Sequence, residues 1–188
     1  MRAIIFDKTM LIAAVSLSPQ HGFSKSPQTS IRLLAGEGIE GDAHCGRTTQ
    51  HLYLKRKDPM LPNLAQVHLI ATELLAELTA KGYLLNPGDL GENVLTTGID
   101  LLALPTGTLL HLGSEAIVEV TGLRTPCSQI DAFRSGLQEH LWGARDAENR
   151  KTRRAGIMSI VHTSGIVFAN DPIRIELPPE PHLPLRPV

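Results

Sequence analysis

The fold class is decided by the stretch Thr108-Leu-Leu-His-Leu-Gly-Ser-Glu-Ala-Ile-Val-Glu-Val-Thr121. Residues 108–112 and 115–121 each have the length and the apolar content of a β-strand, and the turn residues Gly113-Ser114 separate them. A turn at Pro105-Thr-Gly107 comes just before, and residues 91–95 predict a further strand upstream. Closely spaced short strands with turns between them favour a barrel or sandwich over repeating βαβ units. The sequence therefore predicts a mainly β fold with a few short helices.

Segments on both sides of this stretch predict the remaining elements. Short apolar runs predict strands at residues 10–17, 31–34, 66–70, 156–162 and 173–177. A helix is expected from Thr72, as N-cap, to Gly82, because Leu74, Leu75 and Leu78 share one helical face. A helical patch is expected at residues 135–142. The whole chain, 1–188, is interpreted as a single domain with its core at about 30–177.

Four segments are expected to lack regular structure. Residues 18–30 are rich in Ser, Pro and Gln, residues 36–42 form a glycine-punctuated turn, and residues 178–188 are a proline-rich tail. Residues 44–63 have no apolar periodicity and predict a long surface excursion. Loops of that length are usually functional or mobile.

Composition restricts the class of protein. The chain has 188 residues, of which 42% are hydrophobic and 20% charged, as in soluble globular domains. A net charge of −1 and an aromatic content of 4% give no case for nucleic acid or membrane as a partner. Two cysteines cannot form a disulfide scaffold. The apolar run at 10–17 is too short to span a bilayer, and Asp7 and Lys8 interrupt the approach to it, so a cytoplasmic protein is expected.

Cys127 is the first candidate for chemistry. A strand is expected to end at Thr121-Gly122, and Pro126 favours extended geometry at Thr125, which would hold Cys127 at a strand exit. Arg124, three residues earlier, would favour the thiolate, the form that binds soft metals. Arg124 can equally make a bidentate contact with a phosphate. The alternative is a buried cysteine that behaves as a small hydrophobic residue.

The run Gly88-Asp-Leu-Gly-Glu-Asn-Val-Leu-Thr-Thr-Gly-Ile-Asp100 is a second candidate region. Its glycines let the backbone approach a ligand closely, and Asn93, Thr96 and Thr97 supply short hydrogen-bonding side chains. Thr96-Thr97-Gly98 can bind an anion or form an ordinary polar turn. The run has the spacing of neither a Walker loop nor a Rossmann fingerprint.

Other polar residues give weaker signals. His44, Cys45 and His51 lack a recognised zinc spacing. Lys25 is a candidate for a phosphate contact, although loop lysines are most often solvated. Arg154 ends the basic cluster Arg150-Lys-Thr-Arg-Arg154, which is interpreted either as a solvated turn or, at Arg154, as a contact to the same anion.

Several of these stretches together resemble a known family. Gly91-Glu-Asn-Val-Leu-Thr-Thr-Gly98, residues 101–107, Leu112-Gly113 and Val118-Glu-Val-Thr-Gly-Leu-Arg-Thr-Pro-Cys127 are similar in order and spacing to the signature of MOSC domains. Gly41-Asp-Ala-His44 resembles the N-terminal motif of that family, and residues 156–161 and 171–175 resemble its closing strands. The resemblance covers nearly the whole chain, and the cysteine-bearing motif is its most specific part.

The resemblance implies a fold and a cofactor. MOSC domains share a closed β-barrel of complex topology, like the barrel domain of pyruvate kinase. They occur in molybdenum cofactor sulfurases, in the mitochondrial amidoxime-reducing component and in bacterial reductases of N-hydroxylated purines. The resemblance implies that Cys127 is the molybdenum ligand beside the pterin dithiolene of molybdopterin and that His44 borders the cofactor. Arg124, Thr125 and Asn93 become candidates to hold the pterin phosphate, and Thr96, Thr97, Lys25 and Arg154 are further candidates for cofactor contacts.

The expected function follows from that resemblance. The first hypothesis is a molybdenum-dependent oxidoreductase that reduces N-hydroxylated substrates, such as hydroxylaminopurines or amidoximes, with electrons from a separate donor protein. The alternative is a non-catalytic carrier of the molybdenum cofactor or a sulfur-transfer module, and a third is a fold in which Cys127 is inert. Asp131 and His44 are the candidates for proton donation. Unlike the mitochondrial proteins and the bacterial purine reductase, the chain is expected to lack an N-terminal partner domain and a helical C-terminal region.

Overall fold

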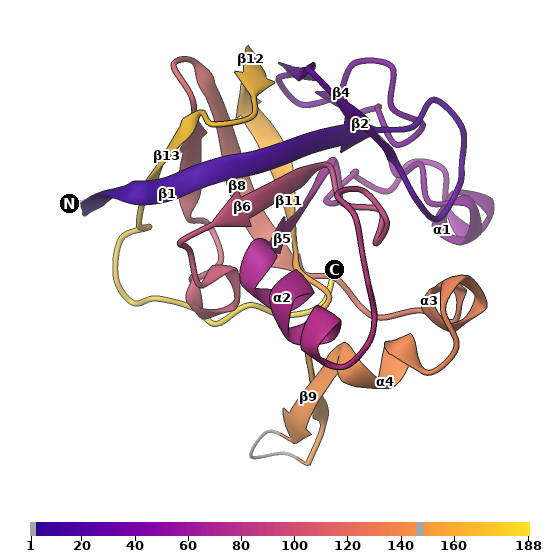
Figure 1. Cartoon of the computed structure of the whole chain (residues 1–188). Coiled ribbons are helices and arrows are strands. Elements are labelled where there is room, and N and C mark those ends of the chain that lie inside the picture. The colour runs from indigo at the N-terminus through magenta and orange to yellow at the C-terminus, as the bar shows by residue number, and fades with distance from the viewer. Residues whose placement is uncertain (1–2, 146–148) are drawn as a thin grey trace.

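A closed β-barrel forms the body of the protein (Figure 1). The computed structural model describes residues 3–145 and 149–188. The main sheet of this part of the chain has eight strands in the order β13-β7-β8-β11-β5-β6-β1-β2, and β1 also pairs with β13, which closes the ring. These strands are β1 (Ile4–Leu17), β2 (Ser26–Gln28), β5 (Val67–Ala71), β6 (Val94–Thr97), β7 (Leu109–Leu112), β8 (Ala116–Leu123), β11 (Ile157–Thr163) and β13 (Pro172–Glu176).

Alternating side chains fill the barrel. Along β8, Ala116, Val118 and Val120 are buried, while the residues between them are half-buried. β11 places Ile157 and Val161 in the same core cluster, as expected for strands whose successive side chains point to opposite faces. Because β8 and β11 each bury one face in this way, their pattern of buried residues sets their register in the sheet.

The wall formed by β5 and β6 is buried on both of its faces. β5 pairs in parallel with β6, and α2 (Thr72–Ala80) follows β5 directly. Ile70 and Leu95 point away from the barrel interior into a second apolar cluster, together with helical side chains. That cluster contains Leu75 and Leu78 of α2, Ile130 of α3 (Gln129–Phe133) and Leu137 of α4 (Leu137–His140). The helices α2, α3 and α4 therefore cover one side of the barrel (Figure 1).

Smaller elements complete the described part of the chain. One small sheet has the order β12-β3-β4, and a two-stranded sheet pairs β9 with β10. Helix α1 has no buried residue, and a 3-10 helix, η1, follows β6. Their bounds are β3 (Ser30–Leu34), β4 (Gly38–Ile39), α1 (Leu52–Lys57), η1 (Leu101–Ala103), β9 (Trp142–Arg145), β10 (Lys151–Arg153) and β12 (Gly165–Phe168).

The structure confirms the predicted mainly β fold and the closed barrel, and it corrects several local predictions. Thr72 is not the N-cap of α2: Ala71 occupies that position, and the Thr72 hydroxyl donates to Glu73 at 3.2 Å. β6 begins at Val94 and not at Gly91, because residues 88–91 form a turn with positive φ at both glycines. Residues 151–153, expected in a solvated turn, form β10. β1 is longer than predicted, and β2 and α1 lie in segments expected to be irregular.

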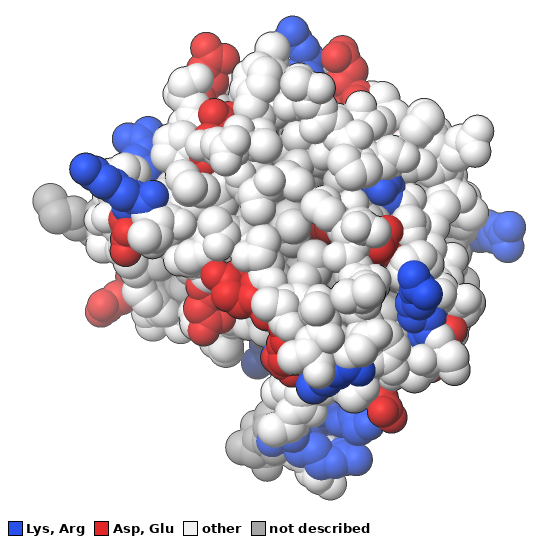
Figure 2. Space-filling view, in the orientation of Figure 1, with Lys and Arg blue, Asp and Glu red and all other residues white. Residues whose placement is uncertain are grey.

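The surface carries charges of both signs. On the face in Figure 2, lysine and arginine side chains gather at the lower end, over the β9–β10 hairpin, and elsewhere both signs are mixed. Among the described residues, no helix is long and apolar enough to cross a bilayer.

Candidate cofactor-binding site

Asn93 joins three strands at one edge of the barrel wall. Its backbone N–H donates to the carbonyl of His68 at 2.8 Å, and its carbonyl accepts the N–H of Ser16 at 2.8 Å. The side-chain Nδ2 donates to the Ser16 carbonyl and to Asp42 Oδ2, both at 3.1 Å, and Oδ1 accepts the His68 N–H at 3.1 Å. Asn93 is 3% exposed, so its hydrogen bonds are made away from water and fix the ends of β1, β5 and β6 relative to one another.

Asp42 is the acceptor at the centre of the neighbouring loops. It forms an ion pair with Lys25 and accepts hydrogen bonds from the Ser18 N–H at 3.2 Å and the His44 N–H at 2.9 Å. His44 Nδ1 lies 3.2 Å from Asp42 Oδ1. Burial alone would raise the pKa of Asp42, but the hydrogen bonds from His44 and the Lys25 ammonium outweigh burial and hold that pKa well below its usual range. The carboxylate therefore positions both Lys25 and His44.

Two glycines let the Lys25 segment pack onto the loop before β6. A Cβ on Gly88 would lie 2.3 Å from the Lys25 carbonyl oxygen, and one on Gly91 would lie 2.4 Å from that of Phe23. Both glycines have positive φ, which other residues rarely adopt. The Lys25 N–H donates to the Gly88 carbonyl at 2.8 Å, so the two segments are joined directly.

Arg124 reaches the same loop from the end of β8. Its backbone N–H donates to the Gly156 carbonyl at 3.0 Å, and Nη1 donates to the Leu90 carbonyl at 2.9 Å. The guanidinium lies over the ring of Phe23, 5.7 Å from its centroid. Within residues 3–145 and 149–188, no carboxylate lies within 4.0 Å of this guanidinium to form an ion pair. Among the described residues, Arg124 therefore brings to the site a positive charge that no ion pair matches.

Glu92 is a buried acid that the sequence analysis did not single out. The residue is 1% exposed, and its Oε1 accepts the Gly88 N–H at 2.5 Å. Its Oε2 has no hydrogen-bond partner in the part of the chain that the structure describes. Burial raises the pKa of Glu92 to about 7, although hydrogen bonds from backbone groups and the attraction of Arg124 act in the opposite direction. This carboxyl group therefore changes its protonation state near neutral pH.

His68 is the second buried titratable group that sequence reasoning missed. Its Nε2 lies 2.8 Å from the carbonyl oxygen of Ala155, which can only accept, so Nε2 carries a proton. Burial, followed by repulsion from Arg124, lowers the pKa of His68 to about 3. The ring is therefore neutral at physiological pH and serves as a hydrogen-bond donor to the segment that follows β10.

Cys127 follows Arg124 in the segment between β8 and α3. The residue is half-buried, and its Sγ lies 3.8 Å from Oε1 of Gln129. Burial lowers the pKa of Arg124, while the proximity of Cys127 and Glu92 acts in the opposite direction, so both groups lie within electrostatic range of the guanidinium. Thr125 is exposed, and its hydroxyl accepts a hydrogen bond from Arg153 Nε at 3.0 Å.

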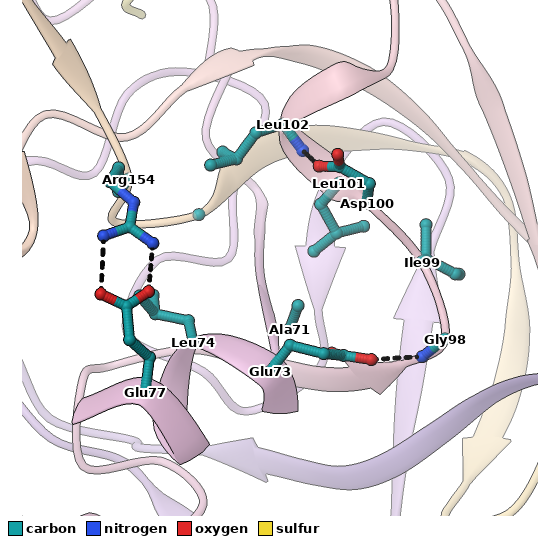
Figure 3. Close-up of a pocket in the computed structure, with 11 residues that line it drawn as sticks. Ala71, Glu73, Leu74, Glu77, Gly98, Ile99, Asp100, Leu101, Leu102 and Arg154 are labelled. Carbon is teal, nitrogen blue, oxygen red and sulfur yellow. Dashed lines mark hydrogen bonds and ion pairs between the residues drawn. The ribbon is translucent and has the colours of Figure 1, made fainter. Parts of the chain in front are cut away.

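Three candidates lie elsewhere. Thr96 is buried in β6, where its hydroxyl donates to the Ile70 carbonyl at 3.4 Å, and Thr97 pairs with Leu11 of β1. Arg154 binds Glu77 of α2 through both terminal nitrogens (Figure 3). That ion pair borders a cleft of about 320 Å³ between α2 and η1. The structure thus brings Lys25, His44, Asn93 and Arg124 together, and it places Thr96, Thr97 and Arg154 in the barrel wall and at this separate cleft.

The second cysteine differs from Cys127 in its electrostatic setting. Burial raises the pKa of the Cys45 thiol, and the nearby carboxylates of Glu37, Asp42 and Glu40 raise it further. In the described ranges, no group of three or more His, Cys, Asp or Glu side chains is placed to hold a metal ion. A thiol among carboxylates is a poor thiolate, whereas Cys127 lies near a guanidinium.

Known structures share this fold. The YuaD protein from Bacillus subtilis has a TM-score of 0.75 and 23% identity, over 95% of this chain and 100% of that protein. YiiM from Geobacillus stearothermophilus has a TM-score of 0.65 and 16% identity, over 93% and 79%. YiiM from Escherichia coli has a TM-score of 0.59 and 15% identity, over 97% and 73%. At these identities the likeness shows the fold alone.

Sequence comparison assigns the family. No curated protein matches the chain. The MOSC domain family model matches residues 56–174, which is more than half of the chain, and the matched region includes Asn93, Arg124 and Cys127. The chain therefore belongs to the MOSC domain family.

Proposed function

We propose that this protein binds the molybdenum cofactor with Cys127 as the thiolate ligand and reduces N-hydroxylated substrates. The observation that carries the proposal is the position of Arg124. This guanidinium lies three residues before a half-buried cysteine, within its electrostatic range, and binds a neutral carbonyl instead of a carboxylate. A positive charge in such a setting favours both a thiolate and an anionic ligand.

The residues present fit the anionic end of such a cofactor. Arg124 and Lys25 both contact the loop that precedes β6, and Asn93 holds the strands beneath it. Among the described residues, the buried Oε2 of Glu92 on this loop has no hydrogen-bond partner, so one polar atom there is left for a ligand. Arg124 presents a planar donor fork suited to a phosphate, and Lys25 adds a second cation whose position Asp42 fixes.

In this proposal the cofactor carries out the redox chemistry, and the protein binds and orients the cofactor. When bound, the cofactor supplies two-electron redox chemistry at molybdenum. Reduction of R–NHOH to R–NH2 and water consumes two electrons and two protons, and a separate donor protein delivers the electrons. His44 is the proposed proton carrier, because its ring is partly exposed and contacts Asp42. Asp131 is less suited, because its Oδ1 accepts the Gln138 N–H at 2.7 Å beside α4.

Metal analysis of protein expressed in a cofactor-producing host tests the binding step. Cys127→Ser should lose molybdenum, because a hydroxyl is a much poorer ligand for a soft metal. Cys45→Ser is the matched control and should retain molybdenum, since that thiol lies among carboxylates. Equal molybdenum content in the wild type and Cys127→Ser would refute the assignment.

Turnover tests the catalytic step separately. Supplied with reduced viologen, the loaded wild type should reduce hydroxylaminopurine or a simple amidoxime, and Cys127→Ser from the same host should not. A protein that holds molybdenum and reduces no N-hydroxylated compound would instead be a cofactor carrier or a sulfur-transfer module.

A further inference from the structure

The buried carboxyl group of Glu92 has an unusual hydrogen-bonding state. Its Oε1 accepts the Gly88 N–H, while Oε2, although also buried, meets no partner. An unpaired carboxylate oxygen away from water is costly, because it loses its hydration and gains nothing in return. The same oxygen becomes a hydrogen-bond donor once it is protonated, and it then needs an acceptor. The protein supplies none in the described structure.

The charged groups around Glu92 come from several elements. Arg124 from the end of β8 and Lys25 from the segment before β2 are the two cations that attract it. Asp42 neutralises Lys25, with His44 on its other oxygen, and His68 of β5 is neutral. Asp89, on the same loop as Glu92, accepts the Asn86 N–H at 2.8 Å and so caps its own turn. Arg124 is therefore attracted by Glu92 and by Cys127, and no ion pair among the described residues neutralises it.

We propose that Glu92 holds a proton when an anion occupies the site beside Arg124 and Lys25. Its carboxyl group takes up one proton when a tetrahedral dianion binds there, and Oε2 donates that proton in a hydrogen bond to the ligand. The proton comes from solvent and returns there when the ligand leaves. This inference rests on the proposed function in one respect, since the dianion in question is the phosphate end of the cofactor.

Electrostatic repulsion favours the protonated form of Glu92 when the anion binds. An ionised Glu92 and a dianion would repel each other strongly in a site of low dielectric constant, and both would compete for Arg124. Protonation removes the repulsion and converts Oε2 from an unpaired acceptor into a donor. Because linkage is reciprocal, anion binding must raise the proton affinity of Glu92 by the same factor by which protonation raises the anion affinity. The pKa of about 7 in the free protein lets this exchange occur near neutral pH.

Sulfate is the probe, because it stays dianionic across the range used and any proton taken up must bind to the protein. Calorimetric titration of the cofactor-free protein at pH 6 to 9, in buffers of different ionisation enthalpy, measures both the affinity and the number of protons taken up. We expect uptake approaching one proton at pH 8, and an affinity that falls about tenfold per pH unit above 7. Glu92→Gln should bind sulfate with an affinity independent of pH above 7 and should take up no proton.

Glu77→Gln is the matched control, because that carboxylate is partly exposed and pairs with Arg154; the proton uptake of this variant should equal that of the wild type. The carboxyl 13C resonance of Glu92 gives a second measurement that needs no variant, and its titration midpoint should move to higher pH when sulfate is added. Absence of sulfate binding, unchanged uptake in Glu92→Gln or an unmoved midpoint would each overturn the proposal. None of these results depends on molybdenum, so they are distinguishable from failure of the Cys127 assignment.

Discussion

Arg124 and Arg154 lie in two regions of the molecule, and they differ in whether a carboxylate pairs with the guanidinium group. Arg154 gives both terminal nitrogens to Glu77, and Lys81 binds the same carboxylate at 2.8 Å, all at a partly exposed cleft edge. Arg124 gives Nη1 to a backbone carbonyl and lies over an aromatic ring. The charge of Arg154 is therefore neutralised by Glu77, while no ion pair among the described residues neutralises the charge of Arg124.

A guanidinium can serve either in an ion pair within the protein or in the recognition of an external anion. An exposed ion pair contributes little to stability and nothing to anion recognition, because its charge is already matched. A guanidinium held by a neutral acceptor keeps its field and part of its donor fork for another group. Strand position alone could not distinguish the two, since each arginine adjoins a strand end.

Replacing each arginine by alanine should give the largest difference between the two regions, measured as a change in cofactor affinity. Arg124→Ala is expected to weaken cofactor binding by about 2–4 kcal/mol, roughly 30- to 1,000-fold, because a buried charge-assisted contact is lost. Arg154→Ala should change the affinity by less than about threefold, because Glu77 already neutralises that charge. Arg124→Lys should recover only part of the loss, since an ammonium cannot reproduce the planar fork. Cofactor affinity and the melting temperature of the cofactor-free protein, measured together, check this; a lower melting temperature with unchanged affinity would make Arg124 a structural residue.

Hydrogen bonds of the two regions should differ in their effect on stability. Asn93→Ala is expected to lower the free energy of unfolding by about 3 kcal/mol, because it leaves the buried His68 N–H and Ser16 carbonyl without their side-chain partner. Glu73→Ala, which removes the exposed acceptor of the Gly98 N–H at the cleft, should cost less than about 1 kcal/mol. Urea unfolding of the cofactor-free proteins measures both, and similar losses would remove the distinction between the regions.

The pH dependence of stability should reveal Glu92. Its pKa is about 7 in the folded protein and has an ordinary value of 4.5, so between these values the folded state holds a proton that the unfolded state has released. Raising the pH through this window therefore destabilises the wild type, by about 3 kcal/mol once pH 7 is passed. Glu92→Gln lacks this cost, so its stability advantage should grow from pH 4.5 to 7 and then stay constant. His68 contributes the same pH dependence to both proteins, so its contribution cancels in the comparison. If the difference in unfolding free energy between Glu92→Gln and the wild type does not depend on pH, Glu92 is ionised throughout this range.

The smallest effect is expected at the cleft. Glu77→Gln removes the acceptor of Arg154 and Lys81, yet all three groups are partly exposed and screened by solvent. We expect a change in the free energy of unfolding below about 1 kcal/mol, decreasing further with added salt. A larger, salt-independent loss in urea unfolding would mean that this ion pair supports the α2 packing as strongly as Asn93 supports the other region.

Sequence patterns predicted the barrel better than they predicted the site. β8 buries every second residue along its length, and β11 is a short segment rich in apolar residues, so their strand character is local and visible. β12 was missed because it has only four residues and exposes Ile166 and Phe168, and α3 because its five residues are too few to show a period. Thr72 resembled an N-cap by residue type, yet the strand before it supplies the cap position at Ala71.

At the site, the sequence indicated side chains and not their partners. Asp42 and Glu92 both lie in the motifs quoted from the sequence, two residues before His44 and one residue before Asn93. What distinguishes Asp42 and Glu92 is burial against Lys25 and Arg124, which depends on contacts between segments far apart in the chain. Arg154 resembled Arg124 in type and in its proximity to a strand, and only the fold showed that it pairs with Glu77.

The junction of β1 with β13 has a kinetic consequence. Ile5 lies opposite Ile175, so the ring is closed by the first and last strands of the main sheet along the chain. A contact between residues so distant in sequence has a high loop-closure cost, and proteins dominated by such contacts fold in milliseconds to seconds. During synthesis β1 cannot pair with β13 until residues 172–176 have left the ribosome, and that edge of β1 is exposed in the meantime. Asn93 therefore connects the ends of β1, β5 and β6 while the sheet is still open. The pairing of β1 with β13 then closes the barrel.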